Sequence, residues 1–360
     1  MMLAMNQVLH DRPTPFLLVD ADVLEVNITA MAAYARDRRL LLRPHAKTHK
    51  CLQIAVAQLA AGAVGLTVAT VAEAETFIDA GTSGVFIAYP LWVDANKGAR
   101  LRALSERVAL TVGIDSAEGA RALAAHLPHA RVLVEVDSGH HRSGVDPDAA
   151  GDVADAAAHA GLDVRGVFTF PGHSYAPGQG ADVAAQEAFA LATAAASLTK
   201  CGIEPAVVSG GSTPSVGAAH PDVLTEVRPG VYVFGDAQQW ELGTTSPDRI
   251  ALTCLGTVVS HAHGNLVLDS GSKAIGADRS AWASGHGRLL DHPDARISQL
   301  SEHHAVVNWN SDAPLPELGT RLRVVPNHVC NAVNLADELV AVRGGRLVDV
   351  WPVAARGANT

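Results

Sequence analysis

Short apolar runs alternate with alanine-rich segments over the first two thirds of the chain. The runs lie near residues 40–46, 65–70, 84–90, 108–114, 130–136, 163–170, 205–210 and 225–234. Nearly all their positions are apolar, which is typical of parallel strands buried on both faces. Helical patterns such as 51–62, 71–80, 116–126 and 181–200 separate most of the runs, and glycines suited to left-handed caps often close them. The pattern predicts eight strand–helix units.

Eight consecutive units predict a (β/α)8 TIM-type barrel over residues 21–240. A doubly wound open sheet is the alternative, but no GxGxxG follows the first strand. After Trp240 the long helical patterns stop, and short alternating runs separated by glycine turns predict an all-β domain over residues 241–360. Because a strand predicted over residues 13–20 precedes the first barrel unit, we assign residues 1–20 to this β domain as well.

Composition narrows the class of protein. A content of 48% hydrophobic and 18% charged residues excludes a disordered chain. The net charge of -10 and the lack of a basic stripe argue against nucleic-acid binding. No apolar run approaches the roughly 20 residues that cross a membrane, and Met1–Asp11 lacks a signal-peptide core. Scattered cysteines without a CxxC fit a reducing compartment, so we expect a cytoplasmic protein. From the charge and the apolar runs, we expect no nucleic-acid or membrane partner.

The segment Arg43–Lys50 carries two lysines and two histidines directly after the apolar run Leu40–Leu42. In a (β/α)8 barrel, reactive groups lie at the carboxyl ends of the strands. Partial burial lowers the pKa of a lysine and frees its amine to condense with a carbonyl. A solvated basic turn is the alternative explanation for such a segment.

The loop Ser209–Pro214 (SGGSTP) follows the seventh predicted strand, where barrels commonly bind phosphate. Its glycines allow backbone N–H groups to approach an anion, and Ser212 and Thr213 add hydroxyl donors. An ordinary Gly–Ser loop is the alternative, and the pattern GxxxxGK[ST] of a nucleotide site is absent. A lysine on the first strand together with a phosphate loop suggests pyridoxal 5′-phosphate, anchored by its phosphate and joined to lysine as a Schiff base.

A second set of candidate ligands lies in the predicted β domain. His328 and Cys330 are two residues apart, so on a strand they would project from one face and could bind one cation. Two protein ligands would leave positions open for water and substrate, as in catalytic zinc sites. A buried His–Cys pair is the alternative, and the spacing leaves open whether His303 and His304 are further ligands or surface groups.

Taken together, these segments resemble the fold-type III pyridoxal-phosphate enzymes of the D-threonine aldolase and D-serine dehydratase family, which share an alanine-racemase-like barrel. The resemblance covers nearly the whole chain. Its motifs are TPFLLVDxxxLExNI (from Thr14), RPHAKTHK, VEVDSGHHRSGV, SGGSTP, VRPGVYVFGD and PNHVCNAVNLAD (from Pro326).

The resemblance implies a role for each matching residue. Lys47, rather than Lys50, would bear the Schiff base, and Arg142 would lie near the phenolic oxygen of the cofactor. Tyr175 and Arg228 compete for the pyridine nitrogen. The full set expected to bind the cofactor is Lys47, His45, Arg142, Tyr175, Ser209, Gly210, Gly211, Ser212, Arg228, Gly230 and Tyr232. His328 and Cys330 would bind a divalent metal, zinc or manganese, and the family implies a homodimer.

The expected activity is that of a lyase on a small D-configured β-hydroxy amino acid, with Lys47 or His173 as the base. Loss of the β-hydroxyl would give a keto acid and ammonia, as in D-serine dehydratases, whereas Cα–Cβ cleavage would give glycine and an aldehyde. Cys330 favours dehydration, because aldolase members often carry aspartate at that position. Ser301–His304 departs from the SEEH that members often carry. An amino-acid racemase and a non-catalytic cofactor carrier are the remaining alternatives.

Overall fold

The computed structural model describes residues 11–309 and 314–360. The chain divides into two compact units. The β unit comprises Met1–Thr29, Thr48–Cys51 and Val231–Gly357, and the barrel unit comprises Ala30–Lys47, Leu52–Gly230 and Ala358–Thr360. Residues 1–10, on which most of the expectation about a signal peptide rests, lie outside the described part of the chain.

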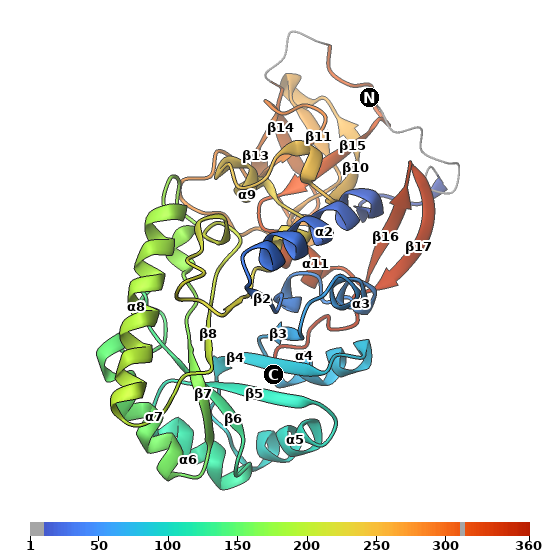
Figure 1. Ribbon diagram of the computed structural model, residues 1–360. Coiled ribbons are helices and arrows are strands. Elements are labelled where there is room, and N and C mark those ends of the chain that lie inside the picture. The colour runs from blue at the N-terminus through green and yellow to red at the C-terminus, as the bar shows by residue number, and fades with distance from the viewer. Residues whose placement is uncertain (1–10, 310–313) are drawn as a thin grey trace. The chain divides into compact units, whose positions relative to one another are not determined.

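Within the described residues, the barrel unit contains an eight-stranded parallel sheet in the order β2-β9-β8-β7-β6-β5-β4-β3. The sheet closes because a parallel bridge joins His45, after β2, to Thr67 in β3. The TIM-type barrel predicted from the sequence is therefore confirmed, and Figure 1 labels its strands and the helices beside them. Its strands are β2 (Leu41–Leu42), β3 (Leu66–Val68), β4 (Gly84–Pro90), β5 (Ala109–Ile114), β6 (Arg131–Glu135), β7 (Asp163–Phe168), β8 (Val207–Gly210) and β9 (Glu226–Val227).

Helices connect the first seven of these strands and pack against the sheet or against their neighbours. They are α3 (Leu52–Ala60), α4 (Val71–Phe77), α5 (Ala95–Ser105), α6 (Ala117–His126), α7 (Ala150–His159) and α8 (Gly180–Lys200). Local signals define their ends. Ser116, for example, caps α6 by accepting a hydrogen bond from the N–H of Gly119, and Gly81 ends the turn after α4 with a φ of 76°.

The last two predicted strand–helix units differ from the pattern. In the described chain, only a 3₁₀ turn over Val216–Ala218 lies between β8 and β9, so no α-helix follows β8. The strand expected over 225–234 is confined to Glu226–Val227, and Val231–Val233 forms another 3₁₀ turn. Pro229 explains the early end, because proline has no N–H to donate to a neighbouring strand.

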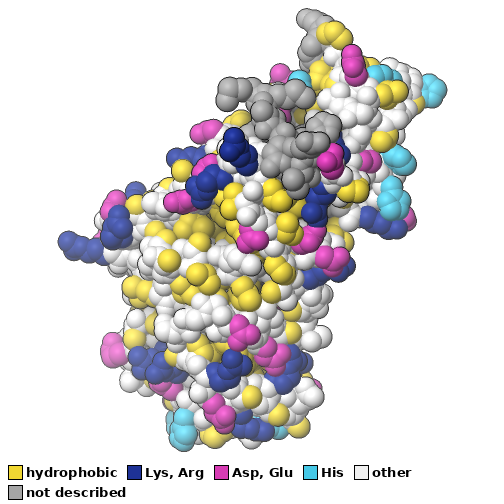
Figure 2. Space-filling model, turned by 90° about the vertical axis from the view of Figure 1, so that its right-hand side faces the viewer, with side chains coloured by type: hydrophobic (Ala, Val, Ile, Leu, Met, Phe, Trp, Pro, Cys, Tyr) yellow, Lys and Arg dark blue, Asp and Glu magenta, His cyan; other side chains and the backbone are white. Residues whose placement is uncertain are grey.

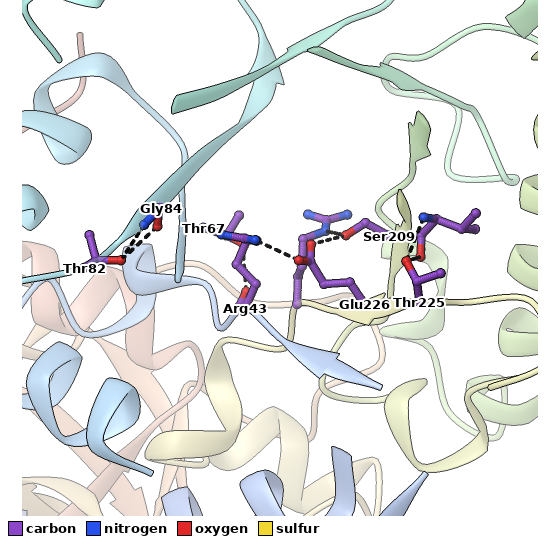
Figure 3. Close-up of polar contacts among 9 residues, drawn as sticks. Arg43, Thr67, Thr82, Gly84, Ser209, Thr225 and Glu226 are labelled. Atoms are coloured by element: carbon purple, nitrogen blue, oxygen red, sulfur yellow. Dashed lines mark hydrogen bonds and ion pairs between the residues drawn. The ribbon is translucent and has the colours of Figure 1, made fainter. Parts of the chain in front are cut away.

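Buried and half-buried polar side chains in or just after β2, β8 and β9 are hydrogen-bonded to one another. Arg43 Nε donates to Glu226 Oε2 at 2.7 Å, and Ser209 Oγ donates to Glu226 Oε1 at 2.8 Å (Figure 3). Arg228 Nε donates to the same serine oxygen at 2.8 Å. A chain of charge-assisted hydrogen bonds in a low-dielectric interior holds its members in one arrangement. These contacts therefore fix the strand ends from which the candidate loops begin.

The β unit contains a nine-stranded sheet in the described residues, ordered β11-β14-β13-β12-β15-β10-β1-β16-β17. Because β10 pairs with both β15 and β11, six of the strands close into a second, antiparallel barrel. Its strands are β10 (Leu252–Ser260), β11 (Leu266–Leu268), β12 (Gly287–Leu289), β13 (Arg296–Leu300), β14 (Ala305–Asn308) and β15 (Arg321–Pro326). The remaining strands are β1 (Phe16–Asp20), β16 (Glu338–Arg343) and β17 (Arg346–Pro352).

The other helices are short, apart from α2 (Ala21–Asp37): α9 (Ala237–Glu241), α10 (Ser272–Ile275) and α11 (Val329–Leu335). On the face drawn in Figure 2, basic and acidic side chains lie interspersed rather than gathered by sign among the coloured residues. Among residues 11–309 and 314–360, no helix has the length and apolar character needed to cross a membrane.

Candidate active site

Lys47 lies in a 3₁₀ turn (Ala46–Thr48) a few residues after β2, at the carboxyl end of the first barrel strand. Its side chain is half-buried, and its backbone N–H donates to His45 Nδ1 at 3.4 Å. The ammonium nitrogen lies 5.4 Å from the centroid of the Phe170 ring. Lys50 differs, because it belongs to the β unit and its ammonium donates to Asn334 Oδ1 at 2.7 Å.

Phe170 lies two residues after the end of β7, and several residues predicted to bind the cofactor lie close to its ring. Arg142 Cζ lies 5.1 Å from its ring centroid, and the Tyr175 ring lies 6.3 Å from it. His140 meets the same ring edge-on at 5.6 Å. The barrel thus brings Lys47, Arg142 and Tyr175 to one aromatic side chain that the sequence interpretation left inside a predicted strand. The signal that could have found Phe170 is its place just beyond a strand end in the VFTF run.

The Ser209–Pro214 loop leaves β8 through Gly211, which has a left-handed φ of 77°. Ser212 Oγ lies 2.8 Å from Ser174 Oγ, so the loops after β7 and β8 are joined. Thr213 Oγ1 is buried and has no hydrogen-bond partner among the residues that the structure describes. Because an unpaired buried hydroxyl costs free energy, a bound anion would satisfy it. The loop therefore fits the phosphate group of pyridoxal phosphate.

The same loop departs from the prediction in one contact. The N–H of Gly211 donates to Glu187 Oε1 at 2.6 Å, and Glu187 is buried on α8. One of the two glycine amides expected to face an anion is thus already bound to a carboxylate. The sequence offered no sign of this partner, since Glu187 stands in the middle of an alanine-rich helix.

Arg228 is fully enclosed in the barrel interior, close to the rings of Phe86 and Phe168. Besides Ser209, its guanidinium donates to the carbonyl oxygen of Thr169. Burial lowers its pKa, and the nearby carboxylates of Glu226, Glu187 and Glu135 oppose that shift. Gly230 is half-buried after β9, and Tyr232 is buried in the Val231–Val233 turn of the β unit.

Within residues 11–309 and 314–360, two further buried atoms near the strand ends lack hydrogen-bond partners. His173 Nε2 lies 2.9 Å from Gln186 Oε1, whereas its Nδ1 is buried and unpaired. Glu135, at the end of β6, has one oxygen bonded to Ser143 at 3.0 Å and the other unpaired. Burial raises the pKa of Glu135, which favours its neutral form. Glu135 is a candidate that the sequence interpretation missed.

The prediction that His328 and Cys330 lie on a strand is wrong. β15 ends at Pro326, and His328 is the residue that precedes α11, so Cys330 lies in the first turn of a helix. They nevertheless interact: although burial lowers the pKa of His328, its contacts with the Cys330 side chain and the Asp278 carboxylate raise it to about 11. Cys330 Sγ also lies 3.4 Å from Thr48 Oγ1, within the β unit.

His328 Nδ1 is hydrogen-bonded to Asp278 Oδ2, which leaves Nε2 as the ring nitrogen for a cation. Once deprotonated, the imidazole and the thiol of this interacting pair are suitable donors for zinc. Within the described residues, no group of three or more His, Cys, Asp or Glu side chains is arranged to hold a metal. His303 and His304 are exposed and join no such group. His328 and Cys330 could therefore supply two donors to a divalent cation and leave its other positions open.

The closed parallel barrel followed by an antiparallel β unit defines the class as alanine-racemase-like. Comparison with known proteins agrees: residues 19–238 match the family described as alanine racemase, N-terminal domain, and residues 251–342 match a serine dehydratase domain. The chain belongs to the alanine racemase N-terminal domain family, within the group that contains D-threonine aldolases and D-3-hydroxyaspartate dehydratases. The resemblance inferred from the sequence is thereby confirmed.

Named relatives match over nearly the whole chain. The sequence is 35% identical to D-threonine aldolase of Arthrobacter over 96% of this chain and 93% of that protein. It is 32% identical to D-threo-3-hydroxyaspartate dehydratase of Delftia over 91% and 93%. Among solved structures, D-threonine aldolase of Filomicrobium marinum superposes with a TM-score of 0.88 at 33% identity, covering 98% of both chains.

Proposed function

We propose that this chain is a pyridoxal-phosphate- and divalent-metal-dependent lyase acting on D-configured β-hydroxy amino acids. The observation that carries the proposal is the grouping of Lys47, Arg142 and Tyr175 around Phe170, beside a loop with an unpaired hydroxyl at Thr213. The named relatives support the substrate class, because threonine and 3-hydroxyaspartate both carry a β-hydroxyl.

The residues would divide the work of holding the cofactor. Lys47 would bind it covalently, and Ser212 and Thr213 would donate to its phosphate. Arg228 directs Nε and one terminal N–H of its guanidinium to Ser209 and Thr169, and its other donors leave it an alternative to Tyr175 as the partner of the pyridine nitrogen. When bound, pyridoxal phosphate supplies an electron sink for charge at the substrate α-carbon, and the cation supplies a Lewis acid for the β-oxygen.

The protein's own groups would move the protons. The half-buried amine of Lys47 would take the α-proton. His173 is the second candidate base, because its buried Nδ1 has no partner in the described structure. His328 and Cys330 would hold the cation, with Asp278 orienting the imidazole.

We favour β-elimination to a keto acid and ammonia, because a thiolate ligand at Cys330 matches the pattern expected of dehydratase members. Retro-aldol cleavage is the second candidate, supported by the 35% identity to an aldolase.

The two outcomes are separated by the products formed with D-threo-3-hydroxyaspartate, D-serine and D-threonine in the presence of pyridoxal phosphate and Zn²⁺ or Mn²⁺. Keto acid and ammonia in equal amounts would support dehydration, and glycine with an aldehyde would support the aldolase. The L-enantiomers serve as controls. Interconversion of D- and L-alanine that survives EDTA would contradict the proposal and indicate a racemase.

A further inference from the structure

The Ser209–Pro214 loop after β8 is hydrogen-bonded to a buried carboxylate from a different element of the barrel. Glu187 lies on α8 and is 1% exposed. Its Oε1 accepts the Gly211 N–H at 2.6 Å. A Cβ added at Gly210 would lie 2.3 Å from the same oxygen. Glu187 therefore contacts both glycines of the loop and accounts for the absence of a side chain at Gly210.

This contact has a direct effect on what the loop can offer an anion. A backbone N–H bonded to a carboxylate cannot also serve fully as a donor to phosphate. Instead, the bond holds Gly211 in its left-handed turn, after which Ser212 and Thr213 follow. Ser212 is held further by Ser174 and Ser215 at 2.8 and 2.9 Å, while the Thr213 hydroxyl keeps its bonding capacity.

We infer that Glu187 is a positioning residue for the cofactor's phosphate group: it anchors Gly211 so that the hydroxyl side chains of the loop, rather than both glycine amides, are directed to the anion. The inference rests on the proposed function, because it takes the Ser209–Pro214 loop as the phosphate site.

The charge of Glu187 adds a second consequence. Burial raises its pKa to about 7, while the Gly211 N–H and the Arg228 guanidinium act in the opposite direction. In the described residues, Arg228 is the charged side chain that acts on this carboxyl group. An ionised carboxylate beneath the loop repels a phosphate dianion, and a protonated one does not. Binding of the cofactor is therefore expected to weaken as the pH rises through 7, with Glu187 responsible for part of that change.

The test uses the full-length protein stripped of cofactor and titrated with pyridoxal phosphate, and separately with inorganic phosphate as competitor, at pH 6 and pH 8. Glu187→Ala leaves the Gly211 N–H without its anchor, and we expect its dissociation constant for pyridoxal phosphate to rise about tenfold at pH 6. Glu187→Gln keeps an acceptor oxygen but removes the charge. We expect it to bind like the wild type at pH 6 and more tightly than the wild type at pH 8.

Asp182→Asn is the matched control, because it removes an exposed carboxylate from the same helix. Circular dichroism shows whether each variant is folded. If Glu187→Ala does not fold, the pH 8 result for Glu187→Gln still tests the role of Glu187. If both Glu187 variants bind pyridoxal phosphate as Asp182→Asn does at both pH values, the inference is wrong while the proposed function stands. If the wild type itself binds no pyridoxal phosphate, the proposed function fails and takes the inference with it.

Discussion

The two units assemble their candidate reactive groups in different ways. In the barrel, Lys47, Arg142 and Tyr175 come from loops after three different strands and meet at Phe170 only because the sheet closes. In the β unit, His328 and Cys330 are near neighbours in the sequence at the start of one short helix, and Asp278 is their added partner. The barrel site therefore depends on global closure, whereas the β-unit pair depends on the local start of α11.

The largest effect is expected from the barrel. Lys47→Ala removes the amine that would join the cofactor, so covalent attachment and lyase activity should both be lost, the latter by at least about 10³-fold. Borohydride reduction followed by peptide mass spectrometry measures the attachment. Lys50→Ala is the control, because Lys50 is bonded to Asn334 in the β unit. Attachment that persists in Lys47→Ala but is lost in Lys50→Ala would show that Lys50 bears the cofactor and that the barrel lysine does not.

In the β unit, His328→Ala and Cys330→Ala should each abolish the binding of a divalent cation after dialysis, since a site with two protein ligands cannot retain the metal with one. Covalent pyridoxal phosphate should remain in both variants. Metal content by mass spectrometry and cofactor absorbance report the two properties separately. His304→Ala, an exposed histidine outside any metal-binding group in the described residues, is the matched control. Equal metal content in all three variants would exclude this pair as the ligands.

Glu187 gives the barrel a pH dependence that can be measured as stability. Its folded pKa of about 7 lies above the ordinary value of 4.5, so the group stabilises the fold below pH 4.5 and this contribution is lost as the pH rises to 7. Glu187→Gln has no such loss. The free energy of unfolding of the variant, relative to wild type, should therefore increase by about 3 kcal/mol between pH 4.5 and pH 8. Chemical denaturation at a series of pH values measures it, and a constant difference would contradict the assignment.

In the β unit, the orientation of the His328 ring depends on Asp278. Asp278→Asn weakens the acceptor for His328 Nδ1, so the affinity for Zn²⁺ should fall by about 10- to 100-fold without loss of cofactor. Competition with a chromophoric chelator gives the affinity. Asp349→Asn, an exposed acid on β17, is the control. An unchanged affinity in Asp278→Asn would mean that His328 needs no such partner.

The smallest effect is expected at Phe170. Phe170→Leu keeps an apolar side chain but removes the aromatic face near Lys47 and Arg142, so the affinity for pyridoxal phosphate should fall by roughly two- to tenfold. Phe189→Leu, at an exposed position on α8, is the control. If the two substitutions change the affinity for pyridoxal phosphate equally, the aromatic ring of Phe170 makes no specific contribution to cofactor binding.

The sequence alone determined the barrel, because eight apolar runs with helical spacers and capping glycines are local signals that need no partner. It also determined which loops carry the candidate residues, because carboxyl ends of parallel strands face one rim. Tertiary structure decided the rest. The start of α11 after Pro326 overrode the expected strand at His328, and closure of the sheet put Phe170 beside Lys47. The contact between Glu187 and Gly211 joins a helix to a loop that no periodicity connects, so only the folded chain reveals it.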